Sequence, residues 1–240
     1  VALGNNNHWM RGGSYGWQAA DKGCIGICWS NTMPNMPAWG GKDRKIGNNP
    51  LIMSIPRSDG RHAVVDCAVS QFSYGKIEET RLKGRQLPVP GGYDSEGNLT
   101  TDPAKIEETW RVLPMGYWKG SGMAIALDMA AALMANGNSG FDMDEQGRGS
   151  CVGCCQIFIA YDPYLFGTRE EIQDMLNKRV AAADSSHPEH EGGLVTCPGE
   201  RTLAARERSM REGVTVDETI WRQVKAIAGG DLDAKDISGR

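Results

Sequence analysis

The sequence lacks the features that mark membrane-spanning, nucleic-acid-binding and disulfide-rich proteins. Its longest apolar stretch, residues 123–135, is interrupted by Asp128 and falls short of the roughly 20 residues that cross a bilayer. Lys and Arg number 26 against 30 Asp and Glu, with no basic stripe, which argues against nucleic acid or a membrane as a partner. Seven cysteines in 240 residues are odd in number and few for a disulfide framework. They predict a reducing, cytoplasmic compartment.

Standard phosphate-binding and metal-binding signatures are also missing. In Gly147-Arg148-Gly149 the next glycine comes one position too late for Gly-x-Gly-x-x-Gly, and no strand precedes it. Cys151, Cys154 and Cys155 form a Cys-x-x-Cys-Cys cluster, but the downstream histidines lie in a polar stretch and Cys155 enters a predicted strand. The sequence therefore excludes a standard Rossmann or P-loop protein and predicts no metal site.

Glycine is abundant, at 31 residues without a repeating period, and apolar runs alternate with helical patterns. These features predict an α/β fold with a mixed sheet and flanking helices. We expect a cofactor-binding domain over residues 1–185 and a helical segment over 186–240. Exposed loops are expected at 87–103 and 141–153. The predicted strands are the chain start, 25–29, 51–55, 63–68 and 156–160, and the predicted helices are 71–83, 121–136, 168–183 and 215–227.

Five residues at three places in the sequence have side chains suited to an acidic ligand or its cofactor. His8 and Arg11, three apart among glycines, suit polarisation of a carbonyl and binding of a carboxylate, although a turn histidine bonded to backbone is equally expected. Asp66 lies inside an apolar strand, where it is either satisfied by backbone N–H groups or serves a site. The Trp118-Lys119 pair at a helix start suits a phosphate or a cofactor ring, against the alternative of simple packing.

Four of the seven tryptophans fall within the first forty residues. Buried packing is the commoner fate of such residues, so we expect an aromatic core, with a stacking surface for a planar ligand as the alternative. The four are Trp9, Trp17, Trp29 and Trp39.

Long motifs along the chain match a known pattern. They include Asn7-His8-Trp9-Met10-Arg11-Gly12-Gly13 and Leu113-Pro114-Met115-Gly116-Tyr117-Trp118-Lys119, with further stretches at 46–52, 72–75, 84–89, 96–100, 156–160 and 198–200. Together they resemble the malate/L-lactate dehydrogenase family, whose cofactor fold is not of the Rossmann type. The resemblance covers almost the whole chain.

The resemblance implies a cytoplasmic, homodimeric reductase that uses NADH, with NADPH as the alternative. The implied reaction reduces the 2-oxo group of the sugar acid 2,3-diketo-L-gulonate to 3-dehydro-L-gulonate. His8 and Asp66 are the expected catalytic residues and Arg11 the expected substrate ligand. The implied cofactor ligands are His62, Ala63, Val64, Val65, Asp66, Cys67 and Ala68, then Trp118 and Lys119, and finally Gly199, Glu200 and Arg201.

One family feature has no counterpart in this sequence. The resemblance implies a proton-donating histidine in a Ser-His-Gly motif, ahead of the position that Val1 matches. Here the one Ser-His pair, at 186–187, is followed by Pro188 in a polar stretch. We therefore expect an N-terminally truncated chain without an assigned general acid. Two alternatives remain, namely another 2-oxo or 2-hydroxy acid substrate (malate, lactate, ureidoglycolate, sulfolactate or a cyclic imine) and an inactive binding or dimerisation fragment.

Overall fold

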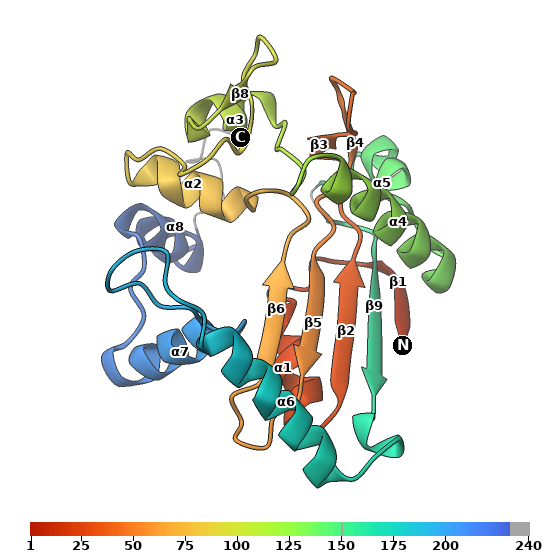
Figure 1. Cartoon of the computed structure of the whole chain (residues 1–240). Helices are drawn as coiled ribbons and strands as arrows, with labels where there is room; N and C mark the ends of the chain where they lie inside the picture. Colours follow the sequence, from red (N-terminus) through yellow and green to blue (C-terminus); the bar gives the residue numbers. More distant parts are fainter. Residues whose placement is uncertain (150, 231–240) are drawn as a thin grey trace. The chain divides into compact units, whose positions relative to one another are not determined.

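The computed structural model describes residues 1–149 and 151–230. The chain forms two compact units, Val1–Gly199 and Glu200–Arg240, each of which is considered by itself. The predicted boundary between residues 185 and 186 stays a prediction. The first unit is built on a five-stranded sheet (Figure 1), whose strands in spatial order are β1 (Ala2–Asn6), β9 (Cys154–Tyr161), β2 (Ile25–Ser30), β5 (Leu51–Ile55) and β6 (Ala63–Cys67).

Helices flank this sheet, which confirms the predicted α/β class. All of the neighbouring strand pairs within it run antiparallel, so the sheet is not mixed in strand direction. The connection between β5 and β6 is one reason. It has only seven residues, whereas a connection between two parallel strands needs a dozen or more. The predicted strands at 25–29, 51–55, 63–68 and 156–160 are all present, and the chain start forms β1.

One face of the sheet is covered by helix α1 (Gly13–Asp21), which the sequence analysis did not predict. Gly16 permits close contact, since a methyl group there would lie 2.7 Å from Cγ2 of Ile52. Apolar side chains fill the layer between helix and sheet, namely Trp9, Cys28, Ile52 and Val64, with Tyr15, Trp17 and Phe158 partly buried beside them. Glycine at positions 12, 13 and 16, in and just before the first turn of this segment, hid the helix from propensity rules.

The other face carries helix α4 (Trp118–Ala135) over one part of the sheet. Ala131 packs on Trp29 and Ile157, and the Trp29 indole donates to the carbonyl of Leu127 at 3.1 Å. Its sequence is apolar on nearly all faces, which favours a position at the centre of the fold, but Leu133 is 79% exposed and Met129 is 58% exposed. One side of α4 is therefore exposed at the surface, although it is apolar.

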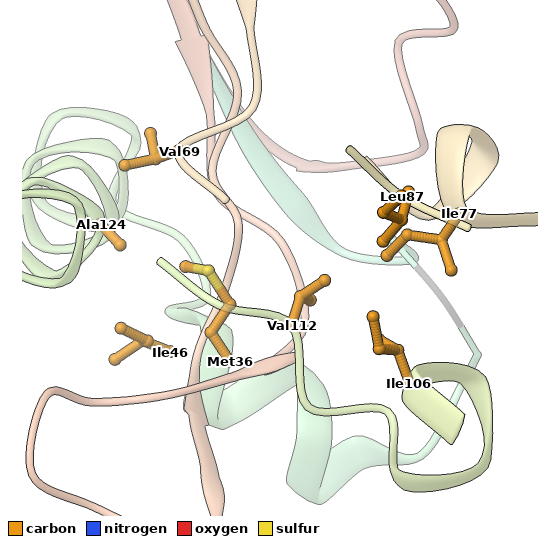
Figure 2. Packing of buried hydrophobic residues seen from close by; sticks show 8 residues of the cluster. All are labelled: Met36, Ile46, Val69, Ile77, Leu87, Ile106, Val112 and Ala124. Atoms are coloured by element: carbon orange, nitrogen blue, oxygen red, sulfur yellow. The ribbon is translucent and has the colours of Figure 1, made fainter. Parts of the chain in front are cut away.

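A second core lies beyond the sheet, where several short elements meet (Figure 2). It consists of Met36, Ile46, Val69, Ile77, Leu87, Ile106, Val112 and Ala124. These side chains join α4 to β3 (Met36–Pro37), β4 (Arg44–Ile46), α2 (Tyr74–Leu82) and α3 (Pro103–Thr109), while β7 (Gly92–Tyr93) and β8 (Leu99–Thr100) form a hairpin within the predicted loop. This core holds α2 and α3 together and connects them to α4, β3 and β4.

The polar stretch expected to form a loop at 141–153 instead begins with helix α5 (Gly140–Gln146). Ser139 caps it, and the Asp142 carboxylate accepts the backbone N–H of Ser139, so a capping box hidden in polar sequence was missed. The helix predicted from residue 168 is confirmed as α6 (Arg169–Asp184), which a capping box at Thr168 begins and which follows the turn η1 (Pro163–Leu165).

The second unit contains α7 (Glu200–Glu212), which was not predicted, and α8 (Glu218–Ala228), which was. Asp217 caps α8, since its Oδ1 accepts the backbone N–H of Thr219 at 2.9 Å, so the helix begins slightly later than the predicted residue 215. Within the described part of the chain, no helix has both the length and the apolar character to cross a membrane.

Candidate functional site

The largest cavity described in the first unit has a volume of about 1170 Å³ and lies where the chain leaves β6. Three segments contribute most of its wall: residues 8–12 ahead of α1, residues 66–68 at the end of β6, and residues 70–76 leading into α2. The wall also contains an aromatic pair, the rings of Tyr74 and Trp110, whose centres lie 4.7 Å apart. The cavity thus offers both polar groups and flat apolar surface.

Arg11 and Asp66, predicted separately, meet in this cavity. Nε of Arg11 lies 3.4 Å from Oδ2 of Asp66, with the two side chains 62% and 27% exposed. Asp66 is therefore not the buried acid that its apolar strand suggested. Its carboxylate packs on the first turn of α1, where a methyl on Gly13 would lie 2.9 Å from its Cγ, and the positive helix N-terminus favours its negative charge.

His8 lines the same cavity from the chain just ahead of Arg11. Its Nδ1 accepts the backbone N–H of Met10 at 3.0 Å, so Nε2 carries the proton of the neutral ring. Nδ1 is therefore bonded to backbone, as the alternative prediction of a turn histidine had it. Nε2 remains available to donate a hydrogen bond to a ligand.

The predicted cofactor stretch at 62–68 runs along an edge strand of the sheet. Val64 is buried under α1, and Val65 is exposed on the other face. Cys67 and Ala68 reach the cavity, and burial together with the Asp66 charge raises the pKa of the Cys67 thiol. At the opposite end of the strand, Nε2 of the buried His62 lies 3.1 Å from Oδ1 of Asp21.

Trp118 and Lys119 form the first turn of α4, close to the end of β6 in space. The backbone N–H of Met115 donates to the carbonyl of Val69 at 2.8 Å, which ties the entry to α4 to the chain just beyond Ala68. Trp118 is 59% exposed, and Nζ of Lys119 lies 5.8 Å from the centre of its ring.

The aromatic surface around Trp118 extends to Trp39, whose ring centre lies 6.3 Å away and 5.4 Å from that of Tyr117. Trp39 is itself 52% exposed, whereas Trp9 and Trp29 are buried in the cores. The early tryptophans therefore include both buried and exposed residues, and the stacking role of the exposed ones stays a prediction. A planar ligand has access to an exposed aromatic surface beside a cation.

Gly199 lies against the other end of β6. The carbonyl of Pro198 accepts the N–H of Val64 at 2.9 Å, and Gly199 has a φ of +101° with no room for a side chain, since a methyl would lie 2.8 Å from the His62 carbonyl. Glu200 and Arg201 begin α7 in the second unit. The structure therefore joins Gly199 to the predicted cofactor strand, and the roles of the next two residues stay predictions.

Several cavity residues were not predicted from the sequence. Asn35 lines the cavity with a buried amide whose Oδ1 has no hydrogen-bond partner among the described residues. Gln71, Tyr74 and Trp110 also line it. No spacing rule links these positions, because they come from separate loops, and only the fold brings them together.

The cysteine cluster has a structural explanation. The Cys154 thiol donates to the carbonyl of Asn6 at 3.4 Å, and Cys155 is fully buried in the core beneath α4. No disulfide joins any of the seven cysteines, all of which lie in the described part of the chain. Among the described residues, no group of three or more His, Cys, Asp or Glu side chains is arranged to hold a metal ion.

Comparison with known proteins gives consistent results. A family model described as malate/L-lactate dehydrogenase matches residues 1–225. Curated proteins named 2,3-diketo-L-gulonate reductase, from Klebsiella pneumoniae (strain 342) and Escherichia coli O1:K1 / APEC, are each 47% identical to the chain over 230 residues. These alignments cover 95% of this chain and 68% of each relative.

Solved structures show the same fold. A dehydrogenase from Sinorhizobium meliloti is 26% identical with a TM-score of 0.80, covering 94% of this chain and 65% of that one. Sulfolactate dehydrogenase from Methanocaldococcus jannaschii is 28% identical with a TM-score of 0.78, covering 98% and 68%. The chain thus spans about two thirds of the length of the proteins that it matches.

Proposed function

Because this chain belongs to the malate/L-lactate dehydrogenase family, we propose that it contributes the cofactor and substrate sites of a nicotinamide-dependent reductase. The proposed reaction is reduction of the 2-oxo group of 2,3-diketo-L-gulonate to 3-dehydro-L-gulonate with NADH. One observation carries the proposal: the Arg11–Asp66 pair lies in the largest described cavity, at the end of the strand expected to bind the cofactor. The 47% identity to reductases named for this substrate supports the choice of sugar acid.

The residues around the cavity fit a bound dinucleotide. From His62 to Ala68 the chain advances six residues, about 20 Å at the rise of a strand, which suits an extended ligand. Trp118 and Trp39 offer exposed rings for stacking at one end, and Lys119 places its ammonium beside them. At the other end, Gly199 packs against the backbone of β6, and the family resemblance implies that it also contacts the cofactor. When bound, the dinucleotide supplies a hydride.

Reduction of a 2-oxo group builds negative charge on its oxygen, which positioned donors must stabilise. Nε2 of His8 is such a donor in the cavity. In the described structure it donates to no other side chain. Arg11, held loosely by Asp66, is free to bind the substrate carboxylate through two parallel hydrogen bonds. Asp66 then keeps the guanidinium oriented, or accepts a hydrogen bond from the substrate. The source of the proton is not assigned to a residue of this chain.

Binding of NADH and turnover test the proposal separately. Titration with NADH is expected to quench tryptophan fluorescence saturably, because Trp118 and Trp39 lie at the proposed site. Lys119→Ala should weaken the quenching, whereas Lys178→Ala, which removes an exposed lysine paired with Asp174 on α6, should not. A folded chain without saturable quenching would refute the cofactor site.

Turnover is measured as NADH consumption with 2,3-diketo-L-gulonate, malate, lactate and sulfolactate compared at equal concentration. Preference for the diketo acid supports the proposal. Preference for sulfolactate would favour the alternative that the 28% identical sulfolactate dehydrogenase suggests. Use of NADPH in place of NADH is tested in the same assay.

We also propose that the protein is a cytoplasmic homodimer, as the family resemblance implies. The apolar residues Met53, Val65 and Ile159, exposed in one cross-strand row of the sheet, support association. Sedimentation of the chain across a concentration series measures the oligomeric state. A strictly monomeric chain would contradict the dimer and leave the chemistry of the cavity unaffected.

A further inference from the structure

A second hollow, of about 520 Å³, lies at the far end of α1 from the main cavity. Its wall comes from the C-terminal end of α1, the loop between β5 and β6, the turn η1 and the start of α6, all within the first unit. Three cationic side chains line it: Lys22, Arg57 and Arg169. Such a concentration of positive charge in a concave surface attracts anions.

Arg57 is built into this wall. Its side chain is only 9% exposed, with one guanidinium nitrogen bonded to Asp59 at 2.9 Å and another to the Arg61 carbonyl at 3.0 Å. Its Nε is buried without a hydrogen-bond partner among the described residues. A buried, incompletely paired cation is costly, and an anion in the hollow would offset that cost.

Arg169 is also held in place, though by an aromatic ring. Its guanidinium carbon lies 4.0 Å from the centre of the Tyr164 ring, and the Tyr164 hydroxyl accepts a hydrogen bond from Gln173 at 2.8 Å. A methyl on Gly23 would lie 4.0 Å from Nη1 of Arg169, so the guanidinium reaches the end of α1 next to Lys22. Across the described residues, neither Lys22 nor Arg169 forms an ion pair with a carboxylate.

The carboxylates near the hollow already have hydrogen-bond partners. Asp21 contacts Nε2 of His62, and Nδ1 of that ring accepts the N–H of Arg57 at 2.9 Å, which fixes His62 as a donor to Asp21. Glu171, in the first turn of α6, bonds to Thr168 and does not line the hollow. The end of α1 and the beginning of α6 contribute opposite helix-dipole effects of similar size. The side chains therefore leave an excess of positive charge.

From this geometry we infer that the hollow binds the phosphate group of a small phosphorylated molecule. A dianion matches two unpaired cations better than a single carboxylate does, and guanidinium groups suit phosphate oxygens. The hollow is larger than one ion requires, which leaves room for an organic part. His62 lines it and also begins the strand of the proposed cofactor site, so the phosphate belongs either to a dinucleotide or to a separate ligand.

Calorimetric titration of the chain with inorganic phosphate, with chloride at equal ionic strength as the reference, tests the site. We expect saturable binding of phosphate, weakened about tenfold or more by Lys22→Gln and by Arg169→Gln. Arg179→Gln is the matched control, because it removes the same charge from α6 some 15 Å further along the helix. Circular dichroism melting curves verify that each variant is folded.

Absence of saturable binding to the wild-type chain, or equal binding by all three variants, would overturn the inference. Competition then identifies the source of the phosphate. Displacement by NADP⁺ alone assigns the 2′-phosphate of a dinucleotide, displacement by NAD⁺ as well assigns its pyrophosphate, and displacement by neither assigns a separate ligand. Because this assay needs no turnover, phosphate binding by a chain that fails to oxidise NADH would refute the proposed reaction and leave this site standing.

Discussion

Replacement of Asn31 tests how the end of the sheet next to the main cavity is held together. Asn31 is fully buried at the end of β2, directly before the cavity residue Thr32. Its Nδ2 donates to Oδ1 of Asp128 and to the carbonyl of Asn138, both at 2.8 Å, and its Oδ1 accepts the N–H of Cys155 at 2.7 Å. One amide therefore joins β2 to α4, β9 and the loop after α4.

Asn31→Ala removes these three bonds, but their consequences differ. The Asp128 carboxylate keeps a bond from Gly140 at 2.9 Å, and the Asn138 carbonyl keeps the Cys155 thiol at 3.3 Å. Only the buried N–H of Cys155 is left without an acceptor, at a cost of about 1–3 kcal/mol. The lost bond to a carboxylate adds about 1.5–3 kcal/mol. We expect the free energy of unfolding to fall by about 3–5 kcal/mol in total.

Urea denaturation followed by circular dichroism measures this change. The slope of the free energy against urea concentration should stay constant, and the melting temperature should fall by roughly 2–4 °C per kcal/mol. Asn98→Ala is the control, since that side chain is exposed and its hydrogen bond to Glu96 is long, at 3.3 Å, so its loss should change stability by about 0.5 kcal/mol or less. A loss below about 1 kcal/mol in Asn31→Ala would refute the reasoning.

Three further predictions concern Asp128, Gly13 and Arg11. Burial raises the pKa of Asp128, so its contribution to stability is complete below the unfolded pKa of about 3.9 and is lost as the pH rises through the folded value. Asp128→Asn keeps an oxygen that accepts from the Asn31 amide and the Gly140 N–H. Its free energy of unfolding in urea, relative to the wild type, should therefore rise as the pH increases from 4 to 7. The same pH dependence in both proteins would contradict this. Gly13→Ala should lower thermal stability by about 1–3 kcal/mol through contact with Asp66, whereas Gly75→Ala in α2, which meets no atom within 4 Å, should stabilise by up to about 1 kcal/mol. Arg11→Gln should raise the substrate KM about 10- to 100-fold, from the loss of about 1.5–3 kcal/mol of charge-assisted hydrogen bonding, and an unchanged KM in steady-state assays would exclude the carboxylate role.

The strands were easier to predict from sequence than the helices. β2, β5, β6 and β9 are short apolar runs bounded by glycine, proline or polar residues, and that pattern alone identifies a buried strand. Helix α1 escaped because it begins at Gly13 and contains Gly16, which local propensity disfavours. Tertiary packing explains both glycines, since Asp66 and Ile52 occupy the space where their side chains would lie.

The candidate site could be predicted only as a set of separate residues. Arg11 and Asp66 are 55 positions apart, and their contact depends on α1 crossing the sheet so that its first turn meets the end of β6. The resemblance implied a set of cofactor residues, whose role stays a prediction, but it did not indicate that a hydrogen bond from Met115 to Val69 ties the entry to α4 to the chain just beyond that strand.

The second hollow, the proposed phosphate site, could not be predicted from the sequence for a different reason. Its cations lie at 22, 57 and 169, each in a polar context typical of an exposed surface. Two of them differ from ordinary surface cations because neighbouring groups hold them in place. Asp59 and the Arg61 carbonyl bind Arg57, and the Tyr164 ring packs against Arg169. A charge held in one orientation loses little entropy when it binds a ligand, so a fixed surface cation binds an anion better than a mobile one does. That property depends on packing, which a one-dimensional charge pattern does not contain.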